Sequence, residues 1–306
     1  MKYSNPLLIY NPNAGGGRAK KRVEKIKDLL INQCGLYNLS IYETQSPKDA
    51  FQRVATMVSE KKIDLVISIG GDGTISEILN SLMTMPKEDR PVFMPIPGGS
   101  GNSLLRDFSI LTAEDAIKKF QAGSTRFLDS LFVESPSSNF SWHCFNILGM
   151  GFISDIARYV VDNGKKLGAF SYILGLFLTL GNFRAYSVKI KGRNDEVLFE
   201  SDKSYFLTVS NSKCSGGSIM IAPDAIVDDG LMDVCVLHDM NRAYFLKGFL
   251  KALKGKHTGM RGCKSFRAEY IEIESDPIFK LMPDGELEGL SPVKVTVLPS
   301  QIRIIA

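Results

Sequence analysis

The sequence predicts a two-domain α/β protein. Over residues 1–128, apolar strand patterns alternate with helical patterns, which is typical of a doubly wound parallel sheet with helices on both faces. Near Asp129 the pattern changes to apolar strands separated by polar turns, which predicts a mostly antiparallel second domain over residues 129–294. The length of 306 residues suits two domains. The C-terminal segment 295–306 contains a last strand that can return to either domain.

In the first domain, four apolar runs predict parallel strands. They are residues 7–10, 39–43, 65–69 and 92–96. Helical spacing of apolar residues predicts three helices between them, over residues 18–32, 49–60 and 75–83. Glycine-rich loops follow three of the strands, at residues 11–17, 70–73 and 97–103. Since ligands of such sheets bind at the carboxyl ends of the strands, we expect the three loops to converge there.

The loop Gly70-Gly71-Asp72-Gly73 is the most informative stretch, because it joins a buried strand to a helix. Glycines let the backbone approach a bulky anion closely, and the following helix N-terminus favours negative charge. Asp72 would repel a phosphate, so it is better suited to hold a metal ion or to accept a proton from an attacking hydroxyl. Each loop taken alone is also compatible with a simple turn.

In the second domain, six apolar runs predict strands. They are residues 131–134, 142–147, 187–191, 205–210, 231–237 and 270–274. Two helical stretches interrupt them, over residues 152–183 and 241–256. Residues 167–183 carry no charge, but a membrane-spanning helix needs about 20 residues. We therefore expect a buried helix that lines an apolar pocket.

Composition argues against several classes of protein, among them nucleic-acid-binding, zinc-binding and disulfide-rich proteins. The net charge of +4 permits attraction to anionic lipid or nucleotide, and no basic and aromatic pattern predicts nucleic-acid binding. The five cysteines are scattered without metal-ligand spacing, so neither zinc nor a disulfide framework is expected. The N-terminus lacks the layout of a signal peptide, which indicates a cytoplasmic location.

Taken together, the motifs resemble the diacylglycerol kinase and sphingosine kinase family of lipid kinases, similar to the bacterial type. The resemblance rests on Gly70–Thr74, on Pro97–Asn102, on the glycine loop at 11–17 and on Asp284-Gly285-Glu286. The family implies a nucleotide-binding domain similar to phosphofructokinase and NAD kinase, a C-terminal β-sandwich that binds lipid, and ATP in the cleft between them. Its cofactors would be ATP and Mg²⁺.

The same resemblance implies roles for individual residues. Asp72 and Glu286 would be the catalytic carboxylates. The nucleotide would contact Asn11, Thr44, Gly70, Gly71, Asp72, Gly73, Thr74, Ile75, Ser76, Gly99, Ser100, Asn102 and Lys166. Lys166 and its neighbour Lys165 could equally be solvated.

The segment 224–231 resembles the bacterial loop that binds a structural Mg²⁺. Asp229 would supply a carboxylate, and Ile226 and Leu231 would supply backbone carbonyls. Oxygen ligands suit Mg²⁺. An ordinary hairpin turn is the alternative.

Residues 149–155 and 165–168 are closer to the sphingosine and ceramide kinase pattern, and Asp155 is a candidate contact for a lipid headgroup. Ala157 stands where sphingosine kinases carry a second Asp, which argues against recognition of a sphingoid amine. Asp155 could alternatively stabilise its helix N-terminus.

Residues 240–256 form a basic amphipathic stretch, which suits either a core helix with a solvated lysine face or peripheral contact with an anionic membrane. A homodimer is compatible with the sequence.

The preferred function is ATP-dependent phosphorylation of a lipid hydroxyl, on diacylglycerol, a sphingoid base, ceramide or a related alcohol. The alternatives are a kinase of a soluble acceptor such as NAD, and a non-catalytic protein that binds lipid or nucleotide.

Overall fold

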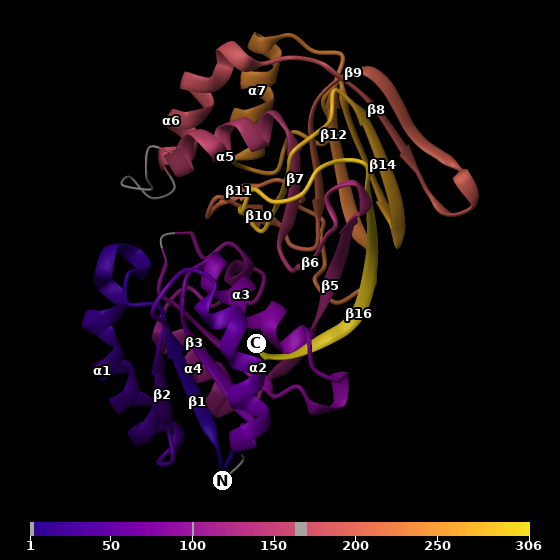
Figure 1. Ribbon diagram of the computed structural model, residues 1–306. Helices are drawn as coiled ribbons and strands as arrows, with labels where there is room; N and C mark the ends of the chain where they lie inside the picture. The colour runs from indigo at the N-terminus through magenta and orange to yellow at the C-terminus, as the bar shows by residue number, and fades with distance from the viewer. Residues whose placement is uncertain (1–2, 100, 163–169) are drawn as a thin grey trace. The chain divides into compact units, whose positions relative to one another are not determined.

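The computed structural model describes residues 3–99, 101–162 and 170–306 (Figure 1). The chain divides into two compact units. Unit 1 runs to Leu128 and includes Ser300–Ala306, and unit 2 spans Asp129–Pro299.

Unit 1 contains a parallel sheet in the order β4-β3-β1-β2. Its strands are β1 (Pro6–Tyr10), β2 (Ser40–Glu43), β3 (Leu65–Gly70) and β4 (Val92–Pro97). Every residue of β1 and β3 is buried, which explains why both strands are almost continuously apolar. The four predicted strands are therefore present.

The helices of unit 1 cover both faces of this sheet (Figure 1). Helix α1 (Ala14–Cys34) packs with α4 (Ala113–Ala122), and α2 (Asp49–Lys61) packs with α3 (Asp72–Met83). This arrangement confirms the doubly wound α/β prediction. Helix α4 was not predicted, although a capping box between Thr112 and Asp115 marks its start.

The C-terminal strand β16 (Val293–Ile305) ends in unit 1, where Ile304 pairs with Phe93 of β4 in parallel. Arg90 secures this end, because its guanidinium donates hydrogen bonds to the main-chain and side-chain oxygens of Gln301 at 3.2 and 2.9 Å. Ala306 donates its backbone N–H to Ser124.

Unit 2 is an antiparallel β-sandwich, as the resemblance implied. Its strands are β5 (Thr125–Ser135, which begins in unit 1), β6 (Phe140–Cys144), β7 (Ile147–Gly151), β8 (Tyr186–Lys191), β9 (Val197–Ser210), β10 (Cys214–Ser215), β11 (Ile219–Met220), β12 (Met232–His238), β13 (Cys263–Ala268), β14 (Tyr270–Asp276), β15 (Leu281–Pro283) and most of β16. One path of neighbouring strands is β13-β12-β9-β8-β14-β16, and β7 pairs with both β9 and β15. Alternate residues of β8 face a core cluster that includes Val188, Leu207 and Ile271.

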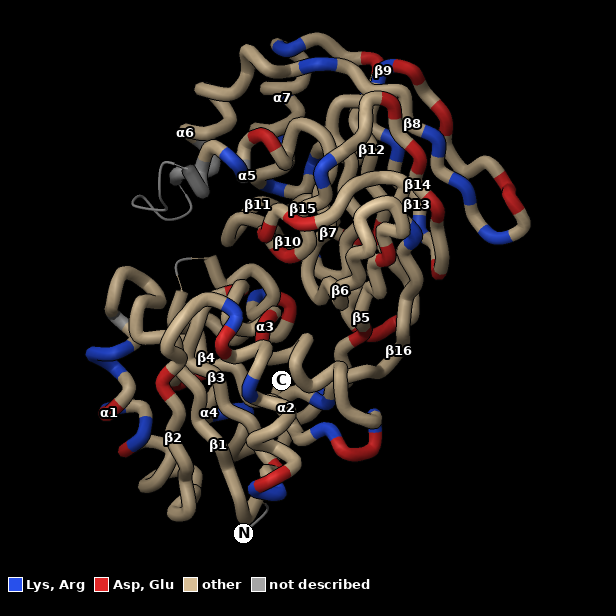
Figure 2. Tube along the Cα trace, in the orientation of Figure 1, with Lys and Arg blue, Asp and Glu red and all other residues tan. Residues whose placement is uncertain are grey.

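Charged residues are frequent along β8, β9 and β14 (Figure 2). Lys189 pairs with Glu200 at 3.1 Å, and Lys191 pairs with Glu274 at 2.8 Å. These cross-strand pairs suit a solvated face opposite the apolar core, and each contributes little stability.

One strand prediction for unit 2 needed correction. The single strand predicted over 142–147 is broken at Phe145 and Asn146, whose backbone N–H groups bond to Asp284 and not to a neighbouring strand. In the predicted helical stretch 152–183, the described residues include the helices α5 (Phe152–Asp162) and α6 (Phe170–Thr179). Helix α7 (Arg242–Ala252) accounts for the second helical stretch.

Helix α6 is not the buried helix that its composition suggested. Leu176 is buried, but Leu174, Phe177 and Leu178 are 38%, 56% and 57% exposed. In the part of the chain that the structure describes, no helix combines the length and apolar character needed to cross a bilayer.

Short 3-10 turns complete the structure. They are Lys87–Asp89, Leu104–Arg106, Pro136–Ser138, Leu180–Asn182 and Arg193–Asp195.

Candidate active site

The loops at the carboxyl edge of the parallel sheet are joined to one another by backbone hydrogen bonds. Thr44 donates to the carbonyl of Tyr10 at 3.0 Å, and Asn11 donates to Ile69 at 3.3 Å. Gly98 donates to Gly70 at 2.8 Å. Parts of the predicted nucleotide site that are distant in the sequence therefore lie along one edge of the sheet.

The two central loops touch through bare backbone. A Cβ atom placed on Gly99 would lie 2.4 Å from the Cα of Gly71, and one on Gly98 would lie 2.9 Å from the nitrogen of Gly70. Real Cβ atoms do not approach this closely, so only glycine fits at these positions. The close contact is the structural reason for the glycines on both loops.

Asp72 is the first residue of α3 and is half-buried. Its Oδ1 accepts a hydrogen bond from the backbone N–H of Leu104 at 3.3 Å, which ties the third glycine loop to this carboxylate. The preceding N-cap, Gly71, provides no side-chain cap. The first amides of α3 and its positive dipole end therefore accompany Asp72 at this edge.

Two asparagines shape the flanking loops. Asn102 has a left-handed backbone (φ 51°), and its side chain exchanges hydrogen bonds with Gly99 at 3.1 and 3.0 Å. The side-chain oxygen of Asn11 accepts from the N–H of Asn13 at 2.9 Å. Gly15–Gly17 all have left-handed φ values, so the predicted loop is present although helix α1 is assigned from Ala14.

Four predicted nucleotide contacts are almost covered by the chain itself. Thr44, Thr74, Ile75 and Ser76 are 8%, 8%, 1% and 5% exposed. Their side chains can offer little surface to a ligand, so their contribution to a site would come from the backbone. Ser100 and Lys166 lie outside the described residues.

Glu286 lies on a tight turn that Asp284 organises. The Asp284 carboxylate accepts hydrogen bonds from the Cys144 thiol at 3.0 Å and from the N–H groups of Phe145 and Asn146 at 3.1 and 2.8 Å. Burial and the negative charge of Asp284 raise the pKa of Cys144 well above its usual value, which keeps the thiol a donor. Glu286 itself is exposed. Sequence reasoning missed this role of Asp284, because its three partners are distant in the sequence.

Asp155 lies in the first turn of α5 and is partly buried. Burial raises the pKa of its carboxyl group, while the positive charges of Arg184, Arg158 and Lys280 act to lower it. The surroundings of Asp155 are therefore already cationic.

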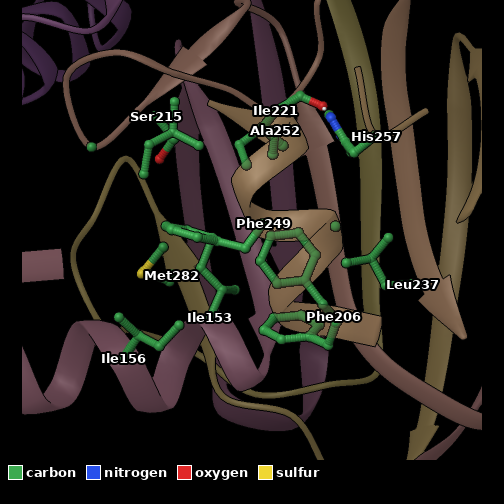
Figure 3. Close-up of a pocket in the computed structure, with 14 residues that line it drawn as sticks. Ile153, Ile156, Phe206, Ser215, Ile221, Leu237, Phe249, Ala252, His257 and Met282 are labelled. Carbon is green, nitrogen blue, oxygen red and sulfur yellow. Dashed lines mark hydrogen bonds between the residues drawn. The ribbon is translucent and has the colours of Figure 1, made fainter. Parts of the chain in front are cut away.

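Unit 2 contains an apolar pocket beneath α5 and α7 (Figure 3). Its cavity has a volume of about 60 Å³. Helix α5 contributes Ile153 and Ile156, helix α7 contributes Phe249, and the strands contribute Phe206 and Met282. The apolar pocket is therefore present, but none of its described lining residues belongs to α6.

In the loop that was predicted to bind Mg²⁺, the positive charge beside Asp229 is the guanidinium of Arg267. Arg267 donates a hydrogen bond to Oδ2 of Asp229 and pairs with Asp233 at 3.3 Å, while the N–H of Leu231 donates to Oδ1 of Asp229 at 3.1 Å. Burial raises the pKa of Asp233, and Arg267 opposes that effect. Both oxygens of Asp229 are therefore engaged. As arranged, the loop does not fit Mg²⁺, so the metal site stays a prediction.

Glycine loops lie at the edge of the parallel sheet, an acidic residue begins the following helix, and the second unit contains an apolar pocket. This combination of features is typical of a kinase that acts on a lipid. Residues 5–133 match the diacylglycerol kinase catalytic domain, and residues 147–306 match the YegS C-terminal NAD kinase beta sandwich-like domain.

Named relatives agree with this class. The chain is 30% identical over 303 residues to the diacylglycerol kinase of Bacillus subtilis (strain 168), covering 97% of this chain and 95% of that protein. It is 22% identical to a protein of Staphylococcus aureus (strain Newman) that is provisionally named a lipid kinase, covering 99% and 97% of the two chains.

A solved structure from Bacillus anthracis str. Sterne, provisionally named a diacylglycerol kinase, superposes with a TM-score of 0.82 at 25% identity, covering 100% of this chain and 98% of that one. The chain belongs to the diacylglycerol kinase family, and it is a lipid kinase. The resemblance inferred from the motifs is confirmed.

Proposed function

We propose that the protein transfers the γ-phosphoryl group of ATP, bound with Mg²⁺, to a hydroxyl of a membrane lipid. The observation that carries this proposal is the meeting of Gly70–Gly71 and Gly98–Gly99 beside Asp72. Bare backbone beside a helix N-terminus is suited to hold a phosphate chain. The Mg²⁺ is part of the nucleotide substrate, and it would reduce the negative charge on the phosphates.

Asp72 would orient the acceptor hydroxyl and accept its proton, with Glu286 as the second carboxylate. Phosphoryl transfer needs little covalent chemistry from the protein, so the positions of these groups and the charge around them carry most of the rate. The hydrogen bonds that Asp284 accepts support the role of Glu286, because they fix the turn on which it lies.

The acceptor would be a neutral lipid alcohol such as diacylglycerol. Asp155 supports this choice over a sphingoid base, because Arg184, Arg158 and Lys280 already surround it with positive charge. A lipid ammonium group would meet repulsion there. The apolar pocket beneath α5 and α7 would hold hydrocarbon, which a soluble acceptor such as NAD does not supply.

Peripheral contact with a membrane would bring the enzyme to its lipid. Helix α7 and the two residues that follow it expose Leu250 by 62% and Leu253 by 37%, together with Lys247, Lys251 and Lys254. Arg242 of α7 donates a hydrogen bond to the carbonyl oxygen of Gly181, just beyond the end of α6. The start of α7 therefore lies next to the end of α6, and both helices expose apolar residues. Such a surface fits an anionic bilayer.

The test is the variant Asp72→Asn, which keeps the size of the side chain and removes its charge. We expect the fold to be retained and phosphorylation of lipid from labelled ATP and Mg²⁺ in mixed micelles to fall by at least a hundredfold, since proton acceptance alone contributes about 10²–10⁴. Asp89→Asn, at an exposed carboxylate of the same unit, is the matched control and should be unaffected.

Near-normal turnover of Asp72→Asn would rule out the assigned role. Turnover of NAD without detergent would favour a soluble acceptor. Offering a total lipid extract and identifying the labelled product by mass spectrometry would name the lipid.

A further inference from the structure

Two cysteines of unit 2 lie next to each other on neighbouring strands. Cys235 belongs to β12 and Cys263 is the first residue of β13, and their sulfur atoms are 3.7 Å apart. The strand register explains this, because Cys235 pairs with Ser265 and Leu237 pairs with Cys263. The two cysteines therefore occupy diagonal positions on one face of the antiparallel pair. They are 28 positions apart in the sequence, so their contact arises only in the folded chain.

The two thiols differ in access and in acidity. Cys263 is partly exposed, whereas only 3% of Cys235 is exposed. The hydrogen bond from Cys235 lowers the pKa of Cys263, burial opposes this effect, and a contact with Ser265 adds to it. The same bond between the two thiols, together with burial, raises the pKa of Cys235 well above its usual value. Cys263 is therefore the thiol that an oxidant can reach and that ionises first.

The pair stands at the two ends of the segment that contains α7. Strands β12 and β13 flank residues 239–262, which include this helix. Phe245 and Ala252 of α7 belong to the same apolar cluster as Cys235, and Cys263 packs against that cluster. A bond between the two sulfurs would close a loop around α7. A closed loop of this kind stabilises a protein chiefly by restricting its unfolded chain.

We propose that Cys235 and Cys263 form a reversible disulfide when the protein meets hydrogen peroxide, and that this bond restrains the segment that carries α7. The sulfurs must close from 3.7 Å to a bond length of about 2.05 Å. Because Cys263 is the end residue of β13, the adjustment involves only one end of that strand. In a reducing environment a bond of this type is transient, which suits a sensor of oxidants.

The reaction balances with one molecule of hydrogen peroxide. The Cys263 thiolate attacks a peroxide oxygen, the O–O bond breaks, and hydroxide leaves while the sulfur becomes a sulfenic acid. The Cys235 sulfur then attacks the sulfenic sulfur, so that an S–S bond forms and the S–O bond breaks. The leaving hydroxide takes the proton of Cys235, and the first hydroxide takes the proton that Cys263 had lost. Two thiols are oxidised to one disulfide, and the peroxide is reduced to two waters.

The experiment exposes the full chain to hydrogen peroxide at pH 7 without nucleotide or lipid, and maps the cysteines by mass spectrometry after digestion without reductant. We expect the peptides of Cys235 and Cys263 to be joined, with the loss of two hydrogens, and dithiothreitol to release them. Cys34 is the internal control, because it is also partly exposed but burial raises its pKa to about 11. Cys263 should be consumed at least about tenfold faster than Cys34, since more of it is thiolate.

The variant Cys235→Ala removes the thiol that would complete the disulfide and adds no volume to the core. We expect its Cys263 to be oxidised without forming the joined peptide. The oxidised unmodified protein should melt several degrees above its reduced form, and Cys235→Ala should show no such rise. Cys34→Ala is the matched control, and it should keep both the joined peptide and the rise.

A Cys263 peptide that stays reduced, or that is oxidised without being joined to Cys235, would overturn the proposed disulfide in the unmodified protein, where no variant needs to fold. A joined protein that melts like its reduced form, or an equal rise in Cys235→Ala, would overturn the proposed restraint of the α7 segment. Because neither measurement contains ATP or lipid, these outcomes are distinct from failure of the proposed kinase reaction.

Discussion

Among single residues, the glycines at the edge of the parallel sheet are the most tightly constrained. A Cβ on Gly99 would clash with Gly71, and a Cβ on Gly98 would clash with Gly70. Any side chain here must push the two loops apart. Because the same loops carry Asp72 and lead into the N-terminus of α3, a small displacement would move the proposed phosphate site as a whole.

We therefore predict that Gly99→Ala lowers lipid kinase activity by at least tenfold and destabilises the protein by about 1–3 kcal/mol, the usual cost of forcing extra atoms into a packed site. Gly259→Ala is the control, since a Cβ there would meet nothing within 4 Å. Thermal melting and initial rates on mixed micelles measure both effects. Equal behaviour of the two variants would show that the loops are not held as close as described.

Single residues also show what the sequence could and could not predict. The glycines and Asp72 were predictable because their motif is continuous and follows a strand. The role of Asp284 was not, because its donors Cys144, Phe145 and Asn146 are far away in the sequence. The engagement of Asp229 by Arg267 was missed for the same reason.

Among the elements, helices α6 and α7 differ most from ordinary core helices. Each buries one side, through Leu176 on α6 and Phe245 on α7. Each also exposes large apolar residues, with Phe177 and Leu250 more than half exposed. Hydrophobic spacing predicted that α7 is a helix, but burial by the rest of unit 2 decides which side faces solvent. That is why the apolar composition of α6 was misread as burial.

We predict that the protein sediments with vesicles containing anionic lipid and much less with purely zwitterionic ones. Replacing Lys247, Lys251 and Lys254 by Gln should weaken this binding by roughly a hundredfold, since each lysine near the surface contributes about 1 kcal/mol. The matched control replaces Lys21, Arg22 and Lys25, exposed on α1, by Gln.

A control triple that weakens sedimentation as much would mean that net charge, and not the surface of α7, attracts the vesicles. Undiminished binding of the α7 triple would remove this helix from the proposed membrane contact.

For the whole molecule, the order of helices and strands was easier to predict from the sequence than the residues at which they begin and end. Strand and helix alternation gave the doubly wound unit, and its change near Asp129 marked the start of the β-sandwich. The return of β16 to unit 1 was left open, because apolar residues alone suit either unit. The bonds from Arg90 to Gln301 and from Ala306 to Ser124 decide it, and these pairings arise only in the folded chain.

Removing Mg²⁺ is expected to affect catalysis and stability differently. Catalysis in the proposed reaction needs the ion with ATP, whereas Asp229 in unit 2 already has the guanidinium of Arg267 beside it. We therefore predict that EDTA abolishes lipid phosphorylation but leaves the melting temperature of the nucleotide-free protein unchanged.

Arg267→Met should instead lower the melting temperature, because it leaves the carboxylates of Asp229 and Asp233 side by side without a counter-charge. A loss of about 1–2 kcal/mol would correspond to a fall of roughly 2–8 °C. Arg193→Met, at an exposed arginine 3.9 Å from Glu269, is the control and should melt like the unmodified protein. If EDTA lowered the melting temperature of the unmodified protein by several degrees, a structural ion, and not Arg267, would be the main partner of Asp229.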